Sequence, residues 1–255
     1  MSKSVLLERQ GRVATLVLNR PPLNILDLAS ISAFSRALEE LTNDDDLQIL
    51  LIRGAGSQAF SAGVAVQDHT PDRVREMLSG FHAAIRALRR VPAVTVAVVK
   101  GHCLGGGMEL AASCDMVAAT DDSSFGQPEI KLGCYPPLAA VLYPRLFGAA
   151  ATCDLLLTGR TIDCSEAEEI GLVTRRASRP EFETVLAELV DGISEHSAAV
   201  TRVTIRAIRA SRAENYDQAL AESERLYLEE LANTSDMNEG INAFIQKRTP
   251  VWKHR

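Results

Sequence analysis

Glu109 follows three consecutive glycines, which could place its carboxylate beside backbone N–H groups that stabilise negative charge. The segment reads Gly101-His-Cys-Leu-Gly-Gly-Gly-Met-Glu-Leu110. Glycine lets the backbone turn sharply and lets a ligand approach the main-chain N–H groups closely. At a helix N-terminus these groups are unpaired, and the helix dipole favours an anion there. Taken alone, the segment also fits an ordinary tight turn with an acid in the first helical turn.

Two further segments could complete a site around this turn. They are Phe60-Ser-Ala-Gly-Val-Ala65 and Phe125-Gly-Gln-Pro-Glu129. The glycine turn in the first of these segments and the one at Gly105–Gly107 each follow an apolar run. Their N–H groups could therefore point into one crevice at the carboxyl edge of a sheet. Two facing donors make an oxyanion hole, and Glu109 with Glu129 would supply an acid and a base. A water held between the carboxylates could add across a conjugated double bond next to a polarised carbonyl.

The elements that must position these segments alternate between strands and helices. Apolar, β-branched runs at 12–18, 47–53, 94–99 and 116–119 predict strands, and 124–133 is expected to be mixed strand and loop. Apolar residues at helical spacing predict a helix after Asp27 and another with Pro71 in its first turn and Val74 to Leu88 on its buried side. The run at 47–53 is almost entirely apolar, as in a sheet covered on both faces. This alternation predicts an α/β fold.

Helical signals dominate after Leu138. Pro144 is expected to interrupt the first of these helices, because proline lacks the N–H group that a helix interior needs. About the last sixty residues predict two or three amphipathic helices. No glycine or proline linker separates them from the rest, so they are interpreted as a helical appendage or an oligomer contact.

The composition excludes several classes of function. The chain has 255 residues, 46% of them hydrophobic, and a net charge of −6, which argues against nucleic-acid or anionic-membrane partners. The five cysteines form no C-x-x-C pair, and the histidines are scattered, so no metal site is expected. The N-terminus lacks the apolar core of a signal peptide, and reduced cysteines are typical of the cytoplasm. A cytoplasmic protein without a membrane span is therefore expected.

Four motifs in order resemble the crotonase, or enoyl-CoA hydratase/isomerase, superfamily. They are Phe60-Ser-Ala-Gly, Gly105-Gly-Gly-Met-Glu-Leu, Cys114-Asp115 and Phe125-Gly-Gln-Pro-Glu-Ile. The resemblance runs from Val13 to about Arg248 and implies a ClpP/crotonase-like fold of repeated ββα units. It implies a core at 1–195 and a C-terminal helical region at 196–255 that builds trimers, usually paired into hexamers. It also implies acyl-CoA substrates, no metal, and no cofactor apart from the coenzyme A of the substrate.

The resemblance also implies roles for individual residues. Val64 and Gly106 match the positions whose N–H groups hold the thioester oxygen. Glu109 and Glu129 match the two glutamates of the hydratases. In the interpretation favoured here, Glu109 activates water and Glu129 supplies the α-proton. Both would contact one water, so the reverse assignment stays open.

The expected coenzyme A site follows in the same way. Leu23, Ile25, Ala62 and Val66 match positions that line the adenine and pantetheine path. A second group, Phe244 and Lys247, matches a C-terminal pair that reaches the nucleotide end of coenzyme A, often in a neighbouring subunit. A cation suits a 3′-phosphate, although Lys247 also fits a helix-end lysine that complements the dipole.

The wall after Glu129 departs from the glycine-rich sequence of ordinary short-chain hydratases. It reads Cys134-Tyr-Pro-Pro-Leu-Ala-Ala140. This stretch, Asp68-His-Thr-Pro-Asp72 and Glu224-Arg-Leu-Tyr-Leu resemble the family members that hydrate cyclohexa-1,5-diene-1-carbonyl-CoA in anaerobic aromatic degradation. That resemblance implies a flat, cyclic dienoyl-CoA substrate. A general short-chain enoyl-CoA hydratase and an enoyl-CoA isomerase are the alternatives within the family.

Three residues leave further questions open. Ala65 stands where an aspartate is common in the family, which raises the alternative of a catalytically idle acyl-CoA-binding protein. His69 and Tyr135 could face the acyl group, although a packing or surface role is the simpler interpretation of each.

Overall fold

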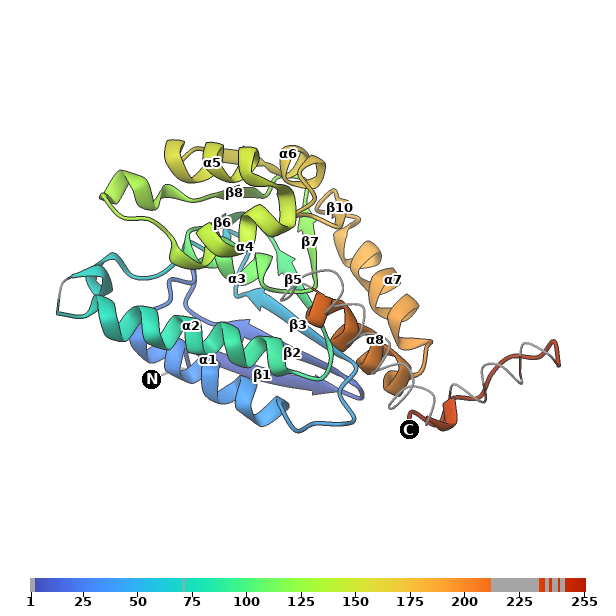
Figure 1. Cartoon of the computed structure of the whole chain (residues 1–255). Coiled ribbons are helices and arrows are strands. Elements are labelled where there is room, and N and C mark those ends of the chain that lie inside the picture. Colours follow the sequence, from blue (N-terminus) through green and yellow to red (C-terminus); the bar gives the residue numbers. More distant parts are fainter. Residues whose placement is uncertain (1–2, 71, 212–233, 237–238, 240–242, 244–245) are drawn as a thin grey trace.

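The structure, a computed structural model, describes residues 3–70, 72–211, 234–236, 239, 243 and 246–255. The chain repeats two strands followed by an α-helix four times, with a short 3₁₀ helix before the α-helix in the second and fourth units. These units confirm the expected α/β architecture of ββα repeats (Figure 1).

Both strands of the first unit, one long strand from each of the next three units and the later strand β10 form a six-stranded sheet of order β1-β2-β3-β5-β7-β10. All neighbouring pairs are parallel except β1 with β2. The strands are β1 (Val5–Gln10), β2 (Val13–Leu18), β3 (Ile49–Gly54), β5 (Val94–Val99), β7 (Met116–Thr120) and β10 (Arg175–Ala177).

The short strands form a second sheet of order β4-β6-β8-β9. Its strands are β4 (Ala59–Ser61), β6 (His102–Leu104), β8 (Ser124–Gly126) and β9 (Thr161–Asp163). In three of the repeated units a long strand runs on into a short one, so the chain passes from the large sheet to the small sheet. The motifs singled out in the sequence follow β4, β6 and β8, and the small sheet therefore brings them together.

The helices cover both faces of the large sheet. Figure 1 shows α1 and α2 side by side along one face, with α7 and α8 behind the other. The helices are α1 (Leu28–Leu41), η1 (Val66–His69), α2 (Val74–Arg90), α3 (Gly106–Ala112), η2 (Pro128–Leu132), α4 (Pro137–Phe147), α5 (Ala149–Thr158), α6 (Cys164–Glu169), α7 (Phe182–Ser194) and α8 (Ala198–Ser211). Among the described residues, no helix combines the length and apolarity needed to cross a bilayer.

The double cover explains why the first four residues of β3, Ile49 to Ile52, are all apolar. Leu50 and Ile52 belong to the hydrophobic core beneath α1 and α2, whereas Ile49 and Leu51 pack with Phe182 of α7. Successive side chains of a strand point to opposite faces, so a strand buried on both faces needs apolar residues at every position. The expectation drawn from residues 47–53 is confirmed.

One local prediction was wrong, and another was right only in part. The helix α4 does not break at Pro144 but runs through it to Phe147, and Gly148 ends it with a φ of 86°. The carbonyl of Ala140, which loses its helical partner, belongs to an exposed residue that water can solvate. The segment 124–133 holds only a three-residue strand, and Glu129 lies in the 3₁₀ helix η2.

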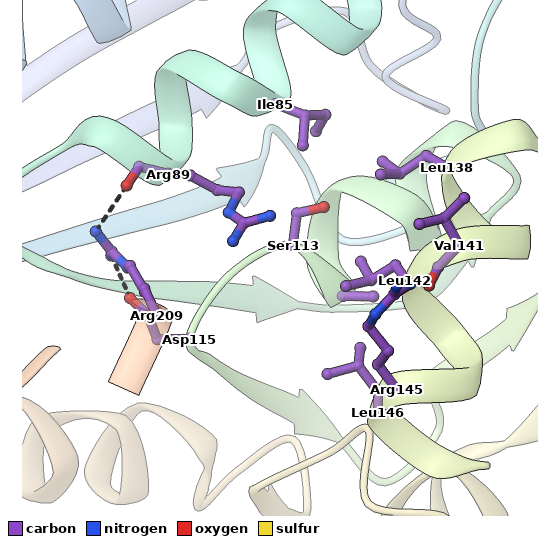
Figure 2. A pocket seen from close by; sticks show the side chains of 11 residues that line it. Ile85, Arg89, Ser113, Asp115, Leu138, Val141, Leu142, Arg145, Leu146 and Arg209 are labelled. Carbon is purple, nitrogen blue, oxygen red and sulfur yellow. Dashed lines mark hydrogen bonds and ion pairs between the residues drawn. The ribbon is translucent and has the colours of Figure 1, made fainter. Parts of the chain in front are cut away.

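Arg209 fixes α8 to the sheet through a fan of hydrogen bonds. Its guanidinium donates to the carbonyl oxygens of Val91 at 2.7 Å and Ala93 at 2.8 Å, and to Oδ1 of Asp115 at 2.9 Å. Figure 2 shows the bonds to Asp115 and to the carbonyl of Arg89. Both partners of the ion pair are nearly buried, at 11% and 5% side-chain exposure, so this pair is shielded from solvent screening.

The division of the chain into a core at 1–195 and a helical region at 196–255 stays a prediction.

We expect Arg209→Lys to lower the free energy of unfolding by about 2 kcal/mol, because one ammonium cannot replace a planar fork that serves several acceptors. Urea unfolding followed by circular dichroism measures the change. Arg36→Lys is the matched control, since the Arg36 side chain is exposed on α1 and bonds only to Ser32 within the described residues. Equal midpoints for the two variants would show that the fan contributes nothing.

Candidate active site

Gly105 brings the segments of the two glutamates into contact. It lies between β6 and α3 with a φ of 53°, which favours glycine, and its N–H group donates to the carbonyl of Gly126 at 2.9 Å. A Cβ atom at Gly105 would lie 2.7 Å from Oε1 of Glu129. Glu109 follows as the fourth residue of α3, as the sequence predicts. The glycine turn therefore leaves the room that the Glu129 carboxylate occupies.

Val64 and Gly106 present two free backbone N–H groups side by side. The chain on either side of Val64 pairs with Leu26, whose N–H group donates to Gly63 at 2.9 Å and whose carbonyl accepts from Ala65 at 2.9 Å. The N–H groups of Val64 and Gly106 donate to none of the residues that the structure describes. A Cβ atom at Gly106 would lie 3.5 Å from the Val64 nitrogen, so the two donors are neighbours. This pair has the form of an oxyanion hole.

Both donors and both glutamates line one cavity of about 350 Å³. Its walls come from the segments after β4, β6 and β8 and from α2, which contributes apolar side chains and His82. The remaining lining residues, apart from the glycines, are Ala62, Val66, His69, Val74, Met77, Leu78, Phe81, Pro128, Leu132, Cys134, Tyr135, Pro136 and Pro137. The structure thus places His69 and Tyr135 at this cavity, in addition to the Pro136–Pro137 wall.

The carboxylate of Glu109, which belongs to α3, is buried against the N-terminus of α4. Only 5% of the residue is exposed, and its Oε1 accepts a hydrogen bond from the N–H group of Ala139 at 2.9 Å. Burial raises the pKa of Glu109 from 4.5 to about 7, while the bond from Ala139 opposes this rise and the charge of Glu129 adds to it. A carboxyl group with such a pKa can exchange a proton near neutral pH.

Glu129 is half-buried beside Gly105 and contacts Gln127. With the amide nitrogen of Gln127 toward the carboxylate, Nε2 donates to Oε2 at 2.9 Å and to Oε1 at 3.1 Å. The amide oxygen then accepts from the hydroxyl of Tyr143. Burial raises the pKa of Glu129 from 4.5 to about 7. Two carboxyl groups with matched pKa values next to an anion-stabilising pair are suited to moving protons at a polarised thioester.

The expected coenzyme A residues are only partly gathered. Ala62 and Val66 line the cavity, and the N–H group of Ala62 donates to the carbonyl of Leu23 at 2.9 Å. This pairing sets Leu23 and Ile25 alongside the cavity rather than in its wall, with Ile25 37% exposed. Lys247 is exposed in the C-terminal segment and does not line the cavity of its own chain, and Phe244 lies outside the described residues.

Sequence reasoning missed the residues that hold the two carboxylates. Gln127 lies inside the motif of Glu129 but was not assigned a role, and Ala139 and Tyr143 belong to a helix considered only as a wall. The one available signal was that Ala139 and Tyr143 are four residues apart, which puts them on one helix face.

A second cavity, of about 230 Å³, lies between α2, α4 and the end of α3. Figure 2 shows its side chains, including Arg89, Ser113 and Arg145 around an aliphatic floor. None of the residues predicted for the site lines it. Among the described residues, no group of three potential ligand side chains is placed to hold a metal ion.

Known proteins resemble this chain over nearly its whole length. A model of the enoyl-CoA hydratase/isomerase family matches residues 8–255. A cyclohexa-1,5-dienecarbonyl-CoA hydratase of Thauera aromatica is 39% identical, over 98% of this chain and 96% of that protein. A probable enoyl-CoA hydratase of Mycobacterium bovis is 36% identical, over 99% of each. A crystal structure of an enoyl-CoA hydratase from Bacillus anthracis superposes with a TM-score of 0.92 at 27% identity, over 99% of this chain and 100% of that one.

The similarity in sequence and the similarity in structure cover the same residues, including every motif that forms the cavity. The family model extends through both glutamates and both free N–H groups. This chain therefore belongs to the enoyl-CoA hydratase/isomerase family and is an enzyme of the enoyl-CoA hydratase type.

Proposed function

We propose that the cavity binds a conjugated acyl-CoA thioester and adds water to its double bond. The observation that carries this proposal is the pair of free N–H groups, Val64 and Gly106, facing a cavity that two glutamates line. The thioester oxygen accepts from both donors. As water attacks Cβ, negative charge moves onto this oxygen, and each donor stabilises the resulting enolate by about 3 kcal/mol.

The two glutamates divide the proton transfers. Glu109 in its ionised form takes a proton from the attacking water as the new C–O bond forms. Glu129 in its protonated form gives a proton to Cα, and the enolate collapses to the saturated centre. The pair must hold one proton in total, and pKa values of about 7 make this state abundant near neutral pH. Rate should therefore pass through a maximum near pH 7.

We further propose that the acyl group is a cyclic diene, and that the product is 6-hydroxycyclohex-1-ene-1-carbonyl-CoA. For this diene, water adds to Cβ of one double bond and Glu129 protonates the far carbon of the other, so the remaining double bond shifts to Cα. The support is twofold: the similarity to the Thauera aromatica protein, and the stiff wall of Tyr135, Pro136 and Pro137 in the cavity. Two consecutive prolines stiffen the backbone of this wall, and a stiff wall suits a rigid planar ring better than a flexible alkyl chain. We propose that this hydration is a step in the breakdown of aromatic acids.

A direct comparison of substrates tests this specificity. We expect kcat/KM for cyclohexa-1,5-diene-1-carbonyl-CoA to exceed that for crotonyl-CoA by about 100-fold, because the rigid wall contributes about 3 kcal/mol only to the ring. The change in ultraviolet absorbance measures both rates, from enoyl to saturated for crotonyl-CoA and from dienoyl to enoyl for the cyclic substrate. Equal or faster turnover of crotonyl-CoA would favour a general short-chain hydratase, as the name of the Mycobacterium bovis relative describes that protein.

An isomerase is separated from a hydratase by labelled water. Hydration in H₂¹⁸O incorporates one oxygen into the product, whereas migration of the double bond incorporates none. Turnover of either kind would exclude an idle acyl-CoA-binding protein, the alternative that Ala65 raised.

The remaining expectations belong to the same proposal. The enzyme uses no metal and no cofactor beyond the coenzyme A of its substrate, acts in the cytoplasm, and assembles as a trimer or hexamer. In that assembly Phe244 and Lys247 reach the nucleotide end of coenzyme A, with the ammonium near the 3′-phosphate. Analytical ultracentrifugation with and without acyl-CoA measures the assembly.

A further inference from the structure

Tyr143 is a fully buried phenol that the mechanism above leaves without a task. It lies on α4 with none of its surface exposed, and its ring packs against Phe147 with centroids 4.8 Å apart. Its hydroxyl bonds to the side-chain amide of Gln127, which is itself completely buried. A buried polar pair of this kind costs stability unless both members are satisfied. The direction of the bond between them decides what Glu129 receives.

The hydroxyl of Tyr143 must be the donor in this bond. Gln127 is its hydrogen-bond partner, and the described residues offer the hydroxyl no second one. A hydroxyl that only accepted would leave its own proton buried and unpaired, which costs about 1–3 kcal/mol. Burial also raises the pKa of Tyr143 well above its ordinary value, so the phenol keeps its proton. The amide oxygen of Gln127 therefore faces Tyr143, and its nitrogen faces Glu129.

We propose that Tyr143 is a positioning residue: its hydroxyl fixes the amide of Gln127 with the nitrogen toward Glu129. This inference rests on the proposed role of Glu129. A carboxylate that accepts from the amide at both oxygens, 2.9 and 3.1 Å away, is held in one orientation across the cavity. The donated bonds also stabilise its ionised form, which makes the protonated form a stronger acid.

Helix α4 then holds both glutamates from one face. The N–H group of Ala139 donates to Glu109, and Tyr143, one turn further along, orients the amide that donates to Glu129. Residues four apart on a helix share a face, so a single rigid element sets the separation of the two carboxylates. The helix that begins in the cavity wall, at Pro137, therefore also holds the two carboxylates.

Several other titratable groups surround Glu129 and enter any pH profile. Glu109 on α3 and the thiol of Cys134 after η2 lie near its carboxylate, and the thiol of Cys103 on β6 lies near the phenol. His69 of η1 and His82 of α2 line the same cavity. Burial raises the pKa of both thiols and lowers the pKa of His82, so these three groups stay neutral near pH 7. The two carboxyl groups therefore change charge near pH 7 while these three neighbours do not.

Tyr143→Phe tests the positioning role, because it keeps the ring and removes the donor. We expect kcat to fall about tenfold with KM within about twofold, and the alkaline limb of the kcat profile to rise by about 0.5 to 1 pH unit. The limb rises because ionised Glu129 loses a donor, so its pKa increases and it stays protonated to higher pH. An unchanged profile would overturn the inference, since a purely structural role lowers the unfolding temperature without moving a limb.

A double-mutant cycle with Gln127→Leu shows whether Tyr143 acts through the amide. Gln127→Leu alone should move the same limb in the same direction. In that background Tyr143→Phe should change kcat by less than about twofold. Fully additive effects of the two substitutions on kcat would contradict a link from Tyr143 through Gln127 to Glu129. Glu129→Gln is measured in parallel. If this variant keeps its turnover, the proposed function fails. If it loses its turnover while Tyr143→Phe has the wild-type pH profile, only the positioning role is rejected.

A fluorine probe covers the case in which Tyr143→Phe does not fold. With 3-fluorotyrosine introduced at position 143, the ¹⁹F resonance should titrate with a midpoint near pH 7, following the carboxyl pair. In Gln127→Leu the amplitude of this titration should fall by more than about half, because the amide that couples the phenol to Glu129 is absent. An amplitude unchanged by Gln127→Leu would overturn the inference.

Discussion

Glu109→Gln and Glu129→Gln are each expected to lower kcat by about 10²- to 10⁴-fold, the usual contribution of a positioned acid or base. Each replacement keeps the shape of the side chain and removes one proton-transfer group from the pair that lines the cavity. Binding of butyryl-CoA, which cannot be hydrated, should change by less than about threefold, because the thioester oxygen is held by backbone N–H groups. Stopped-flow absorbance gives the rates, and isothermal titration calorimetry gives the affinities.

The double variant adds a sharper result. If both carboxylates act on one water, Glu109→Gln with Glu129→Gln should be little slower than the slower single variant. Glu39→Gln is the control, since Glu39 is exposed on α1 and does not line the cavity. Near-wild-type rates in both single variants would exclude the two-glutamate mechanism.

The parts of the site that are local in sequence could be predicted from it. Val64 and Gly106 each lie in a glycine turn after a strand, and Glu109 is fixed by its place in the first turn of α3. Such geometry depends on a few neighbouring residues, so the motifs carry it. The long strands behaved in the same way: residues 94–99 were predicted from composition alone and are β5.

The parts that depend on contacts between distant segments could not be predicted. The strands of the small sheet are three residues long, too short for an alternating pattern to stand out. Strand β1 was missed because only Val5 in it is buried, as expected at a sheet edge where one half of the strand is polar. The bond from Ala139 to Glu109 joins residues 30 positions apart. It depends on where α4 packs, which no local motif encodes.

These contacts change what the Pro136–Pro137 wall is for. Pro137 is the first residue of α4, a position where proline suits a helix because no N–H group is needed there. The free N–H groups of the next residues point toward Glu109, and the Ala139 group bonds to it. The departure from a glycine-rich sequence thus sets the start of the helix that positions the carboxylates, besides shaping the substrate surface.

Glu109→Gln should also make the protein more stable above pH 7. Burial raises the pKa of Glu109 to about 7, against 4.5 in an exposed chain. Between these values the folded state binds more protons than the unfolded state, so the contribution of Glu109 to stability falls as pH rises from 4.5 and levels off above 7. At 1.36 kcal/mol per pKa unit, the ionised group costs about 3 kcal/mol. Glutamine carries no charge, and its oxygen can still accept from Ala139.

The difference between variant and wild type is therefore the quantity to measure. Calorimetry at pH 8 should show a transition about 6 to 10 °C higher for Glu109→Gln, and this difference should shrink toward zero as the pH approaches 4.5. Taking the difference cancels titrations shared by both proteins. A variant less stable than wild type at pH 8 would show that the carboxylate stabilises the start of α4 by more than its burial costs. In the expected case, the ionised form of Glu109 is both the form that catalysis needs and the form that lowers the stability of the folded enzyme most.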